Sequence, residues 1–318
     1  MAETIIICGA GQLGSRYLQG LAQCATPLRI HVQDSSPESL RRTRQRWSEV
    51  SDSSPAHLAT FDTSLDSLPR DAAVAIVATT ADVRPEVVAQ ICGRSRVRFW
   101  ILEKMLTQSE TALDELVAQV AGASAAWVNT PRRIMPWHQA LKSKLSLTPP
   151  VVLKIVGGPW GLACNSVHYL DLCAWWTGEA LVSVDTSRLD SRWRASKRPG
   201  FLEITGTIEA QYSRGSRVIL TANNADVAFT MELSDGERAW QIDEDGGSAR
   251  RDDGLTVAGR LMYQSELSGP MIEAILESGR CGLPSLEEAA VTHRALIRGL
   301  QEHWARAGHP GAASVPVT

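Results

Sequence analysis

A glycine-rich turn near the start of the chain is the first feature whose residue types and spacing indicate chemistry. Gly9-Ala10-Gly11-Gln12-Leu13-Gly14 follows an apolar stretch, residues 4–8, and opens an amphipathic helix. Here Gly9 permits a tight turn, Gly11 lets the backbone approach a pyrophosphate, and Gly14 lets helix and strand pack closely. The helix N-terminus offers unpaired N–H groups and partial positive charge to the phosphates. The turn predicts a dinucleotide site that includes Gly9, Gly11, Gln12, Leu13 and Gly14.

An acidic residue 20 positions beyond Gly14 indicates which dinucleotide is favoured. Asp34 follows the second strand-like stretch, where a carboxylate accepts hydrogen bonds from the adenosine ribose. Because that carboxylate would repel a 2′-phosphate, the sequence favours NAD(H). Ser35 and the arginines from Arg41 onward keep NADP(H) as an alternative. A glycine turn that binds no dinucleotide is the plainer interpretation.

The elements that must position these residues alternate through the first 125 residues. Short apolar runs occur at 4–8, 28–32, 72–78 and 98–102, and helical patterns at 12–24 and 111–121. Strands that alternate with helices predict βαβ units and a parallel sheet. The runs are continuous rather than alternating, which is typical of strands covered on both faces.

The pattern changes after residue 125. We expect strands at 126–129, 151–156, 204–212, 217–222, 227–233 and 239–242, and helices at 132–145, 165–176, 257–278 and 285–307, with a breaker at Thr148-Pro149-Pro150. Successive strands joined by short polar turns predict an antiparallel sheet. The fold class is therefore α/β, with an N-terminal Rossmann domain, a doubly wound parallel sheet, and a C-terminal α+β domain.

The predicted domains are residues 1–125 for the dinucleotide and 126–308 for substrate and oligomerisation. The last helix, 285–307, is a candidate to pack back on the first domain, and 309–318 is expected to be a loose tail. A chain of 318 residues is long enough for two cores.

Composition excludes several classes of partner. Lys and Arg number 32 against 35 Asp and Glu, so no net charge attracts nucleic acid or an anionic membrane. No stretch approaches 18 apolar residues, so we expect no membrane span. The six cysteines are widely spaced and form no C-x-x-C pair. We therefore expect a cytoplasmic protein with no metal site and a small-molecule substrate.

Two further motifs carry a resemblance to a known family. Ala78-Thr79-Thr80-Ala81-Asp82-Val83-Arg84 comes at the end of the apolar run at 72–78, and Glu103-Lys104-Met105 follows the run at 98–102. With the glycine turn, they resemble the glucose–fructose oxidoreductase/inositol dehydrogenase (Gfo/Idh/MocA) family over essentially the whole chain. The resemblance implies a Rossmann domain followed by a domain with an open, largely antiparallel sheet. It adds to the expected cofactor-binding residues Thr79, Thr80, Arg84, Glu103 and Lys104.

The resemblance also implies an NAD(P)-dependent oxidoreductase that acts on a sugar, sugar acid, nucleotide sugar or polyol. Lys104 matches the lysine of the family's E-K-P triplet, which lies between nicotinamide and substrate, while Met105 replaces the proline that often introduces a strained or cis bond. His168 matches the histidine of the family's second domain. Relatives often pair through the open sheet, which implies a homo-oligomer, a dimer or a tetramer.

The sequence departs from the family near that histidine. Many sugar and polyol dehydrogenases of the family carry an aspartate four residues before it, and here that position is Cys164. Ser166 also replaces the usual glycine. The Lys–Asp–His arrangement is incomplete, which weakens an inference to inositol or glucose as the substrate.

Hydride transfer at a carbinol carbon needs a group for the hydroxyl proton and a donor near the oxygen. We predict His168 as the acid/base and Lys104 as the polarising group, and the reverse assignment stays open. A histidine on an apolar helix is otherwise a core residue, and a lysine after a strand is otherwise solvated. Glu103 is expected to orient Lys104.

Arginines at the domain crossover suggest how the substrate is held. Arg132 and Arg133 could clamp a carboxylate or phosphate, and two helix-start arginines that pair with surface acids are an equal alternative. Indole faces stack on sugar rings, and Trp160 is one of the tryptophans beside the predicted site. The expected substrate-binding residues are Lys104, Arg132, Arg133, Trp160, Asn165 and His168.

Two other functions remain as alternatives. One is a redox-neutral enzyme with tightly bound NAD that catalyses hydrolysis, elimination or epimerisation. The other is a non-catalytic dinucleotide-sensing protein, for which Cys164 in place of the aspartate is the main support.

Overall fold

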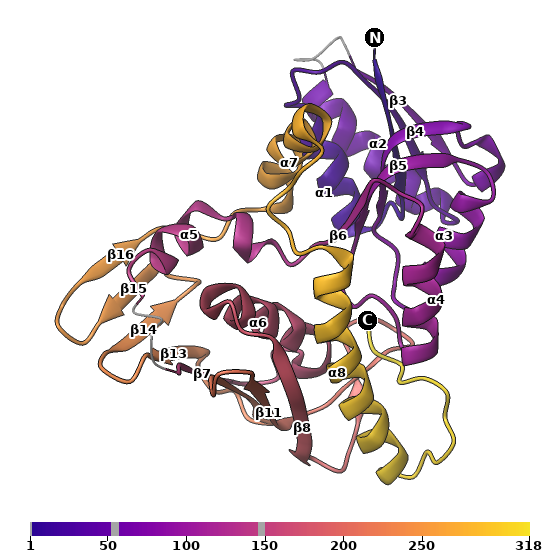
Figure 1. Ribbon diagram of the computed structural model, residues 1–318. Helices are drawn as coiled ribbons and strands as arrows, with labels where there is room; N and C mark the ends of the chain where they lie inside the picture. Colours follow the sequence, from indigo (N-terminus) through magenta and orange to yellow (C-terminus); the bar gives the residue numbers. More distant parts are fainter. Residues whose placement is uncertain (1, 52–56, 146–149) are drawn as a thin grey trace. The chain divides into compact units, whose positions relative to one another are not determined.

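The computed structural model of the chain describes residues 2–51, 57–145 and 150–318 (Figure 1). It divides into two compact units, which differ from the single boundary expected at residue 125. Unit 1 contains Met1–Thr107, Thr111–Asn129 and Met262–Glu287, and unit 2 contains Gln108–Glu110, Thr130–Leu261 and Glu288–Thr318. A late segment therefore returns to the first unit. The predicted breaker at 148–149 lies outside the described residues.

Unit 1 is built on a six-stranded parallel sheet in the order β3-β2-β1-β4-β5-β6. Its strands are β1 (Glu3–Cys8), β2 (Leu28–Gln33), β3 (Leu58–Asp62), β4 (Asp71–Val77), β5 (Arg96–Leu102) and β6 (Ala125–Val128). The predicted Rossmann fold is confirmed. The sequence analysis assigned no residues to β3, an edge strand whose burial alternates so that it has no continuous apolar run.

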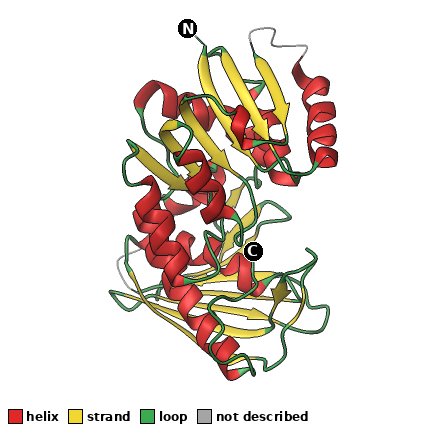
Figure 2. Cartoon of the chain, turned by 90° about the vertical axis from the view of Figure 1, so that its right-hand side faces the viewer, coloured by secondary structure: helices red, strands yellow, loops and turns green. Residues whose placement is uncertain are grey.

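Helices of unit 1 pack against this sheet (Figure 2). They are α1 (Gln12–Leu21), α2 (Pro37–Ser51), the 3₁₀ turn η1 (Leu65–Ser67), α3 (Arg84–Cys92), α4 (Glu110–Val120) and α7 (Gln264–Ser278). Helix α7 crosses α1 closely, because a Cβ on Gly20 would lie 2.5 Å from the Ser265 carbonyl oxygen. Glu273 of α7 also accepts hydrogen bonds of 2.9 Å from the backbone and hydroxyl of Thr26.

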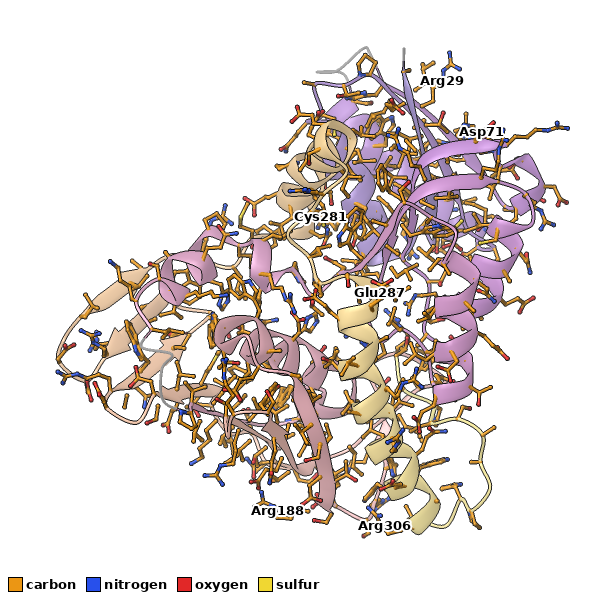
Figure 3. All side chains as sticks on the ribbon, viewed as in Figure 1. Arg29, Asp71, Arg188, Cys281, Glu287 and Arg306 are labelled. Atoms are coloured by element: carbon orange, nitrogen blue, oxygen red, sulfur yellow. The ribbon has the colours of Figure 1, made fainter. Side chains whose placement is uncertain are left out.

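Unit 2 is built on an eight-stranded sheet in the order β16-β15-β14-β13-β7-β12-β11-β8. Its strands are β7 (Val152–Gly157), β8 (Leu181–Leu189), β11 (Gly206–Tyr212), β12 (Arg217–Ala222), β13 (Thr230–Ser234), β14 (Ala239–Asp243), β15 (Ser248–Arg251) and β16 (Thr256–Ala258). Only the β7–β12 pair is parallel, so the largely antiparallel sheet is confirmed. Burial alternates along β13 and β14, which leaves one face exposed. Arg188, labelled in Figure 3, lies on the edge strand β8 and pairs with Glu209 of β11.

The remaining elements of unit 2 are the 3₁₀ turn η2 (Pro131–Ile134), α5 (Pro136–Lys142), α6 (Leu162–Thr177), α8 (Leu286–Arg306) and a small hairpin of β9 (Arg194–Ala195) and β10 (Leu202–Glu203). Two predicted helices were wrong in extent. The helix expected at 132–145 is divided at Pro136, which lacks an N–H group and begins α5 instead. The helix expected at 257–278 begins only at Gln264, because residues 256–258 pair as β16.

The C-terminal tail was predicted to be loose, and this is wrong. Val315 and Val317 are each only 1% exposed. The Val315 N–H donates to the Gln108 carbonyl over 3.1 Å, and the Gln108 side chain donates to the Val317 carbonyl over 3.0 Å. Alternating small apolar residues let this segment bury side chains and satisfy its backbone at once, so the tail is part of unit 2.

Candidate functional site

The glycine turn joins β1 to α1 at the carboxyl edge of the parallel sheet. Gly9 has a φ of +94°, and a Cβ there would lie 2.7 Å from the Ala78 carbonyl carbon. A Cβ on Gly14 would lie 1.7 Å from the Gly9 carbonyl oxygen. Backbone conformation and close packing therefore require glycine at these two positions, as the motif predicts.

Gly11 differs, because nothing in the protein requires glycine there. Its φ is −67°, and a Cβ would meet no atom within 4 Å. The space beside Gly11 is open, at the N-terminus of a helix whose first turn holds no acidic side chain and no side-chain cap. Such a position suits a ligand that approaches the backbone closely and carries negative charge.

Asp34 ties the end of β2 to the glycine turn. Its Oδ2 accepts a 2.6 Å hydrogen bond from the Ala10 N–H, and its Oδ1 accepts one of 2.8 Å from Ser36. Arg46 of α2 approaches the same region from the side, donating to Gln12 Oε1 over 2.9 Å and to the Ser15 hydroxyl. Arg46 is one of the arginines from Arg41 onward that keep NADP(H) as an alternative, but its contacts with Gln12 and Ser15 gave no signal in the sequence.

Arg84, expected to bind the cofactor, is placed differently. Its side chain is 1% exposed and donates to the carbonyl oxygens of Thr79, Met105 and Leu106. The guanidinium therefore joins the loops after β4 and β5 instead of facing solvent or a ligand. Thr79 and Thr80 remain half-buried at the carboxyl edge, where the predicted site lies.

Glu103 and Lys104 end β5 at the same edge. Glu103 is 4% exposed, and its Oε1 accepts hydrogen bonds of 2.6 Å from both the Tyr17 hydroxyl and the Asn129 amide. Burial raises the pKa of this carboxyl, and the two donors offset only part of that effect. The Asn129 amide also donates to Gln264 over 2.8 Å. The carboxyl is thus held beside Lys104, which is half-buried and precedes a cis peptide bond to Met105.

The predicted histidine lies in unit 2. His168 is half-buried on α6, whose first residue follows Gly161 at a φ of +84°. The carboxylate of Glu203, a residue that the sequence analysis missed, accepts hydrogen bonds from the backbone N–H groups of Ala163 at 2.9 Å and Cys164 at 3.2 Å. The first turn of α6 contains no acidic residue, so nothing in the sequence indicated that its N-terminus is capped. The capping carboxylate comes from Glu203, on the distant strand β10.

Trp160 and Asn165 lie around the same end of α6. The Asn165 amide donates to the Trp160 carbonyl over 2.9 Å, and the Trp160 indole donates to the Thr221 carbonyl over 3.0 Å. The indole ring packs edge-on against Tyr169 and Phe229, with ring centres 5.7 and 6.0 Å apart. The sequence pattern thus brought Trp160, Asn165 and His168 to one end of one helix.

Arg132 and Arg133 are both engaged by carboxylates of unit 2. Arg132 donates to the two oxygens of Glu244 over 2.7 and 2.6 Å. Arg133 donates to the two oxygens of Asp171 over 2.9 and 2.5 Å. Both arginines therefore pair with acids of the protein, as the second alternative from the sequence expected. The acids differ from that expectation because Glu244 and Asp171 are buried rather than on the surface.

The two buried carboxyls respond oppositely to their surroundings. Burial would raise the pKa of Glu244, but Arg132 and His138, whose Nε2 lies 2.9 Å from Glu244 Oε1, hold that pKa well below its usual range. Burial raises the pKa of Asp171, and Arg133 and Thr130 offset only part of it. Glu244 was not identified from the sequence, since it lies 112 residues from its arginine.

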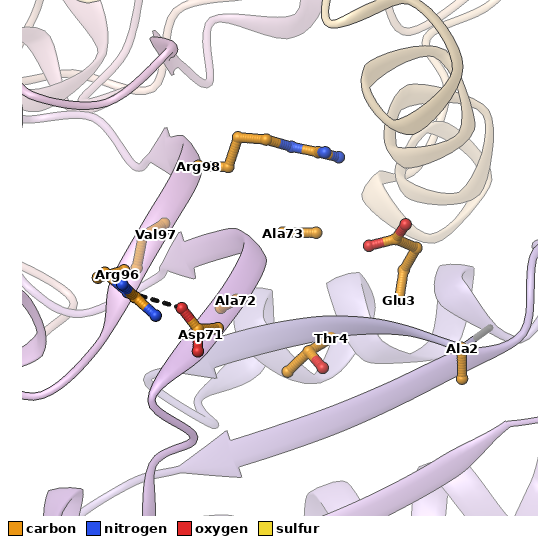
Figure 4. A pocket seen from close by; sticks show the side chains of 9 residues that line it. All are labelled: Ala2, Glu3, Thr4, Asp71, Ala72, Ala73, Arg96, Val97 and Arg98. Atoms are coloured by element: carbon orange, nitrogen blue, oxygen red, sulfur yellow. Dashed lines mark hydrogen bonds and ion pairs between the residues drawn. The ribbon is translucent and has the colours of Figure 1, made fainter.

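A separate cavity of about 400 Å³ lies at the opposite edge of the parallel sheet (Figure 4). It is lined by the first residues of β1, β4 and β5, among them Glu3, Asp71 and Arg96. Arg96 and Asp71 form an exposed ion pair of 2.8 Å across it. In open α/β sheets ligands bind at the carboxyl ends of the strands, so this cavity is not the predicted site.

Among the described residues, no three His, Cys, Asp or Glu side chains gather where a metal ion could be held. Within the same part of the chain, no helix combines the length and apolarity needed to cross a membrane.

No protein-family model and no curated protein matches the sequence, but solved structures match the fold. An oxidoreductase from Agrobacterium radiobacter, solved with NAD⁺, L-tartaric acid and magnesium, matches with a TM-score of 0.71 at 13% identity, over 96% of this chain and 97% of that one. The WlbA dehydrogenase from Bordetella pertussis, solved with NADH and UDP-GlcNAcA, gives 0.68 at 13% identity, over 95% and 96%. The myo-inositol dehydrogenase from Lactobacillus casei, solved with NAD(H) and myo-inositol, gives 0.66 at 17% identity, over 95% and 96%. Over nearly its full length, the chain has the fold of these oxidoreductases, as its motifs predict.

Proposed function

We propose that the chain is an NAD-dependent oxidoreductase that transfers a hydride to or from a carbinol or carbonyl carbon of a sugar, sugar acid, nucleotide sugar or related polyol. The observation that carries the proposal is the open space at Gly11, on a turn where Gly9 and Gly14 are fixed by packing. The similar solved structures support it, since those named above contain NAD(H) and a hydroxylated small molecule.

The residues present fit a dinucleotide. A side chain at Gly11 would fill the space that a pyrophosphate needs, and the N-terminus of α1 supplies N–H groups and positive potential. Asp34 would accept the ribose hydroxyls and disfavour a 2′-phosphate. NADP(H) is the alternative, with Arg41 and its neighbours as the cations that could accept it. When bound, the nicotinamide supplies or accepts the hydride.

The chain's own residues would handle the proton and the substrate oxygen. Lys104 polarises that oxygen, and His168 takes or gives the hydroxyl proton, with the reverse assignment as the alternative. Glu103, locked by Tyr17 and Asn129, is a positioning residue for Lys104. Trp160 offers an aromatic face and Asn165 an amide to the substrate. Because Arg132 and Arg133 hold buried acids, we assign them to the support of α6 rather than to a substrate clamp.

Cys164 favours a second candidate. No carboxylate side chain occupies the position of the family's aspartate, and the Cys164 thiol donates to the Gly161 carbonyl instead. A redox-neutral enzyme with tightly held NAD, or a dinucleotide sensor, fits this departure. Nicotinamide that co-purifies and does not exchange would favour the redox-neutral enzyme. Binding of NAD(H) without turnover of any compound would favour the sensor.

Assembly and location are also part of the proposal. The exposed face of the unit 2 sheet, formed by strands such as β11, β12 and β13, would join copies into a dimer or tetramer. All six cysteines are free thiols, which suits a cytoplasmic, reducing compartment.

The test is calorimetry followed by turnover on the full chain. NAD⁺, NADH and NADP⁺ are titrated first, and we expect NAD(H) to bind more tightly than NADP⁺. Sugars, sugar acids, nucleotide sugars and polyols are then followed by the absorbance of reduced nicotinamide. Binding of neither nucleotide would contradict the proposal at its base.

A further inference from the structure

The β9–β10 hairpin of unit 2 carries a concentration of positive charge that the proposed chemistry does not use. Arg192, Arg194, Lys197 and Arg198 lie within seven residues, and all four are exposed. Among the described residues, none of the four has an ion-pair partner. Like charges so close together repel each other, so the cluster costs stability unless an anion occupies it.

Acidic side chains near the hairpin are already engaged. Asp190 accepts hydrogen bonds from the Thr205 hydroxyl over 2.6 Å and from the Asn224 amide over 3.0 Å. The two oxygens of Glu203 accept the backbone N–H groups at the start of α6. These hydrogen bonds hold both carboxylates away from the cations, and the described residues show no ion pair between either acid and Arg192, Arg194, Lys197 or Arg198.

The hairpin is held in place from two sides. The Trp193 indole donates to His303 of α8 over 3.2 Å, and its ring packs edge-on against Trp304 at 5.3 Å. On the other strand, the Leu202 N–H donates to the Pro316 carbonyl of the C-terminal tail over 2.7 Å. A charged cluster on an anchored hairpin keeps its geometry, which suits a binding element better than a mobile loop.

The pairing of β9 with β10 places Arg194 beside the residue that contacts α6. Arg194 pairs directly with Glu203, so both side chains project from the same face of the hairpin. Glu203 reaches the backbone of Cys164, and His168 lies four residues later, about 6 Å along the helix axis. Arg194 thus lies on the hairpin face from which Glu203 reaches the start of α6, the helix that carries Asn165 and His168.

We propose that the β9–β10 hairpin binds the phosphate of a phosphorylated or nucleotide-linked sugar, and that this anionic group, rather than the sugar hydroxyls alone, selects the substrate. Arginine forks match phosphate oxygens, and four cations exceed what one carboxylate needs. The inference rests on the proposed function, because it names the substrate class of that site.

The experiment measures affinity for four compounds on the full chain with saturating NAD⁺: glucose, glucuronate, glucose 1-phosphate and UDP-glucose. We expect both phosphate compounds to bind at least about tenfold more tightly than glucose and glucuronate, and added salt to reduce the difference. The variant Lys197→Ala/Arg198→Ala changes only the exposed tip of the hairpin and should lose that preference. Arg194→Ala should lose it as well, and Arg194→Lys should retain part of it.

Arg29→Ala/Arg250→Ala is the matched control, since it removes two exposed arginines distant in sequence from the hairpin (Figure 3 shows Arg29). It should leave the preference unchanged. Equal affinity for glucose and the phosphate compounds would overturn the inference, as would glucuronate binding as tightly as they do, or a preference that survives the tip variant. If neutral sugars are turned over as well as phosphorylated ones, the inference fails and the proposed function stands. If phosphate binds through the hairpin with no turnover of any sugar, the proposed function fails alone.

Discussion

The carboxyl edge of the unit 1 sheet and the α6 region of unit 2 position their polar groups in different ways. At the glycine turn the constraint comes from the backbone: Gly9 is required by its positive φ and by the backbone of Ala78 after the neighbouring strand β4, and Gly14 by the carbonyl oxygen of Gly9. Around α6, the charged groups depend on distant partners: Arg132 pairs with Glu244, and Glu203 accepts hydrogen bonds from the backbone at the start of the helix. A site that depends on backbone conformation can therefore be predicted from a short sequence motif. A site that depends on buried ion pairs between distant residues cannot.

Breaking the Arg132–Glu244 pair should give the largest effect. Arg132→Met leaves a buried carboxylate without its main cation, which we expect to lower the free energy of unfolding by about 3–5 kcal/mol. Urea denaturation of each variant measures this. The double variant Arg132→Met/Glu244→Leu should recover most of the loss, since no buried charge remains. A single variant as stable as the wild type would show that the pair does not hold unit 2 together.

Removing the two reacting groups should cost turnover rather than stability. Lys104→Met and His168→Gln should each lower kcat/KM by about 10²–10⁴-fold on a substrate found in the turnover panel, because each removes a proton-transfer or polarising group. Thermal denaturation should change little. If the double variant loses no more than the worse single variant, the two act as a unit. Full turnover by Lys104→Met would remove it from the site.

The packed tail gives a middle-sized prediction. Val315→Asp places a charge where the side chain is 1% exposed and should lower the free energy of unfolding by about 2 kcal/mol or more. Ser314→Asp changes the exposed neighbour and is the control, expected to be nearly neutral. Equal stability of both variants would contradict the packing of Val315 and would favour the loose tail expected from the sequence.

Two buried glutamates, Glu103 in unit 1 and Glu244 in unit 2, should contribute to the free energy of unfolding with opposite dependences on pH. The pKa of Glu103 is raised above 4.5 in the folded state, so its contribution is favourable below pH 4.5 and is lost as the pH rises through the folded value. The pKa of Glu244 is lowered, so its contribution is present above pH 4.5 and is lost as the pH falls. Glu103→Gln should gain stability relative to the wild type as the pH rises toward 7, because the wild type must then ionise a buried carboxyl.

Glu244→Gln should instead be less stable than the wild type at pH 7, and the difference should shrink below pH 4.5. Chemical denaturation of both variants across this range measures the slopes. Slopes of the same sign would contradict the environments assigned to these carboxyls.

Much of the fold followed from the sequence because its signals are local. Continuous apolar runs marked β1, β2, β4 and β5, and the glycine turn identified the strand and helix that flank it. The edge strand β3 was missed because its burial alternates, and Pro136 divided a helix whose apolar spacing continued past it.

Predictions of side-chain roles were limited by long-range partners. Arg84 carries the same charge whether it faces a ligand or three carbonyl oxygens, and only the packing of the loops after β4 and β5 decides between them. The roles of Lys104 and His168 remain predictions.

The central claim is that Gly11 is kept free of a side chain by a bound dinucleotide rather than by the protein. Calorimetric titration of NAD⁺ into the wild type and Gly11→Ser, with thermal denaturation of both, tests it most directly. Because serine is a favourable helix N-cap, the account predicts an unchanged or slightly higher Tm together with at least about a tenfold loss of affinity. Equal affinity in the two proteins, or no binding to the wild type, would contradict it.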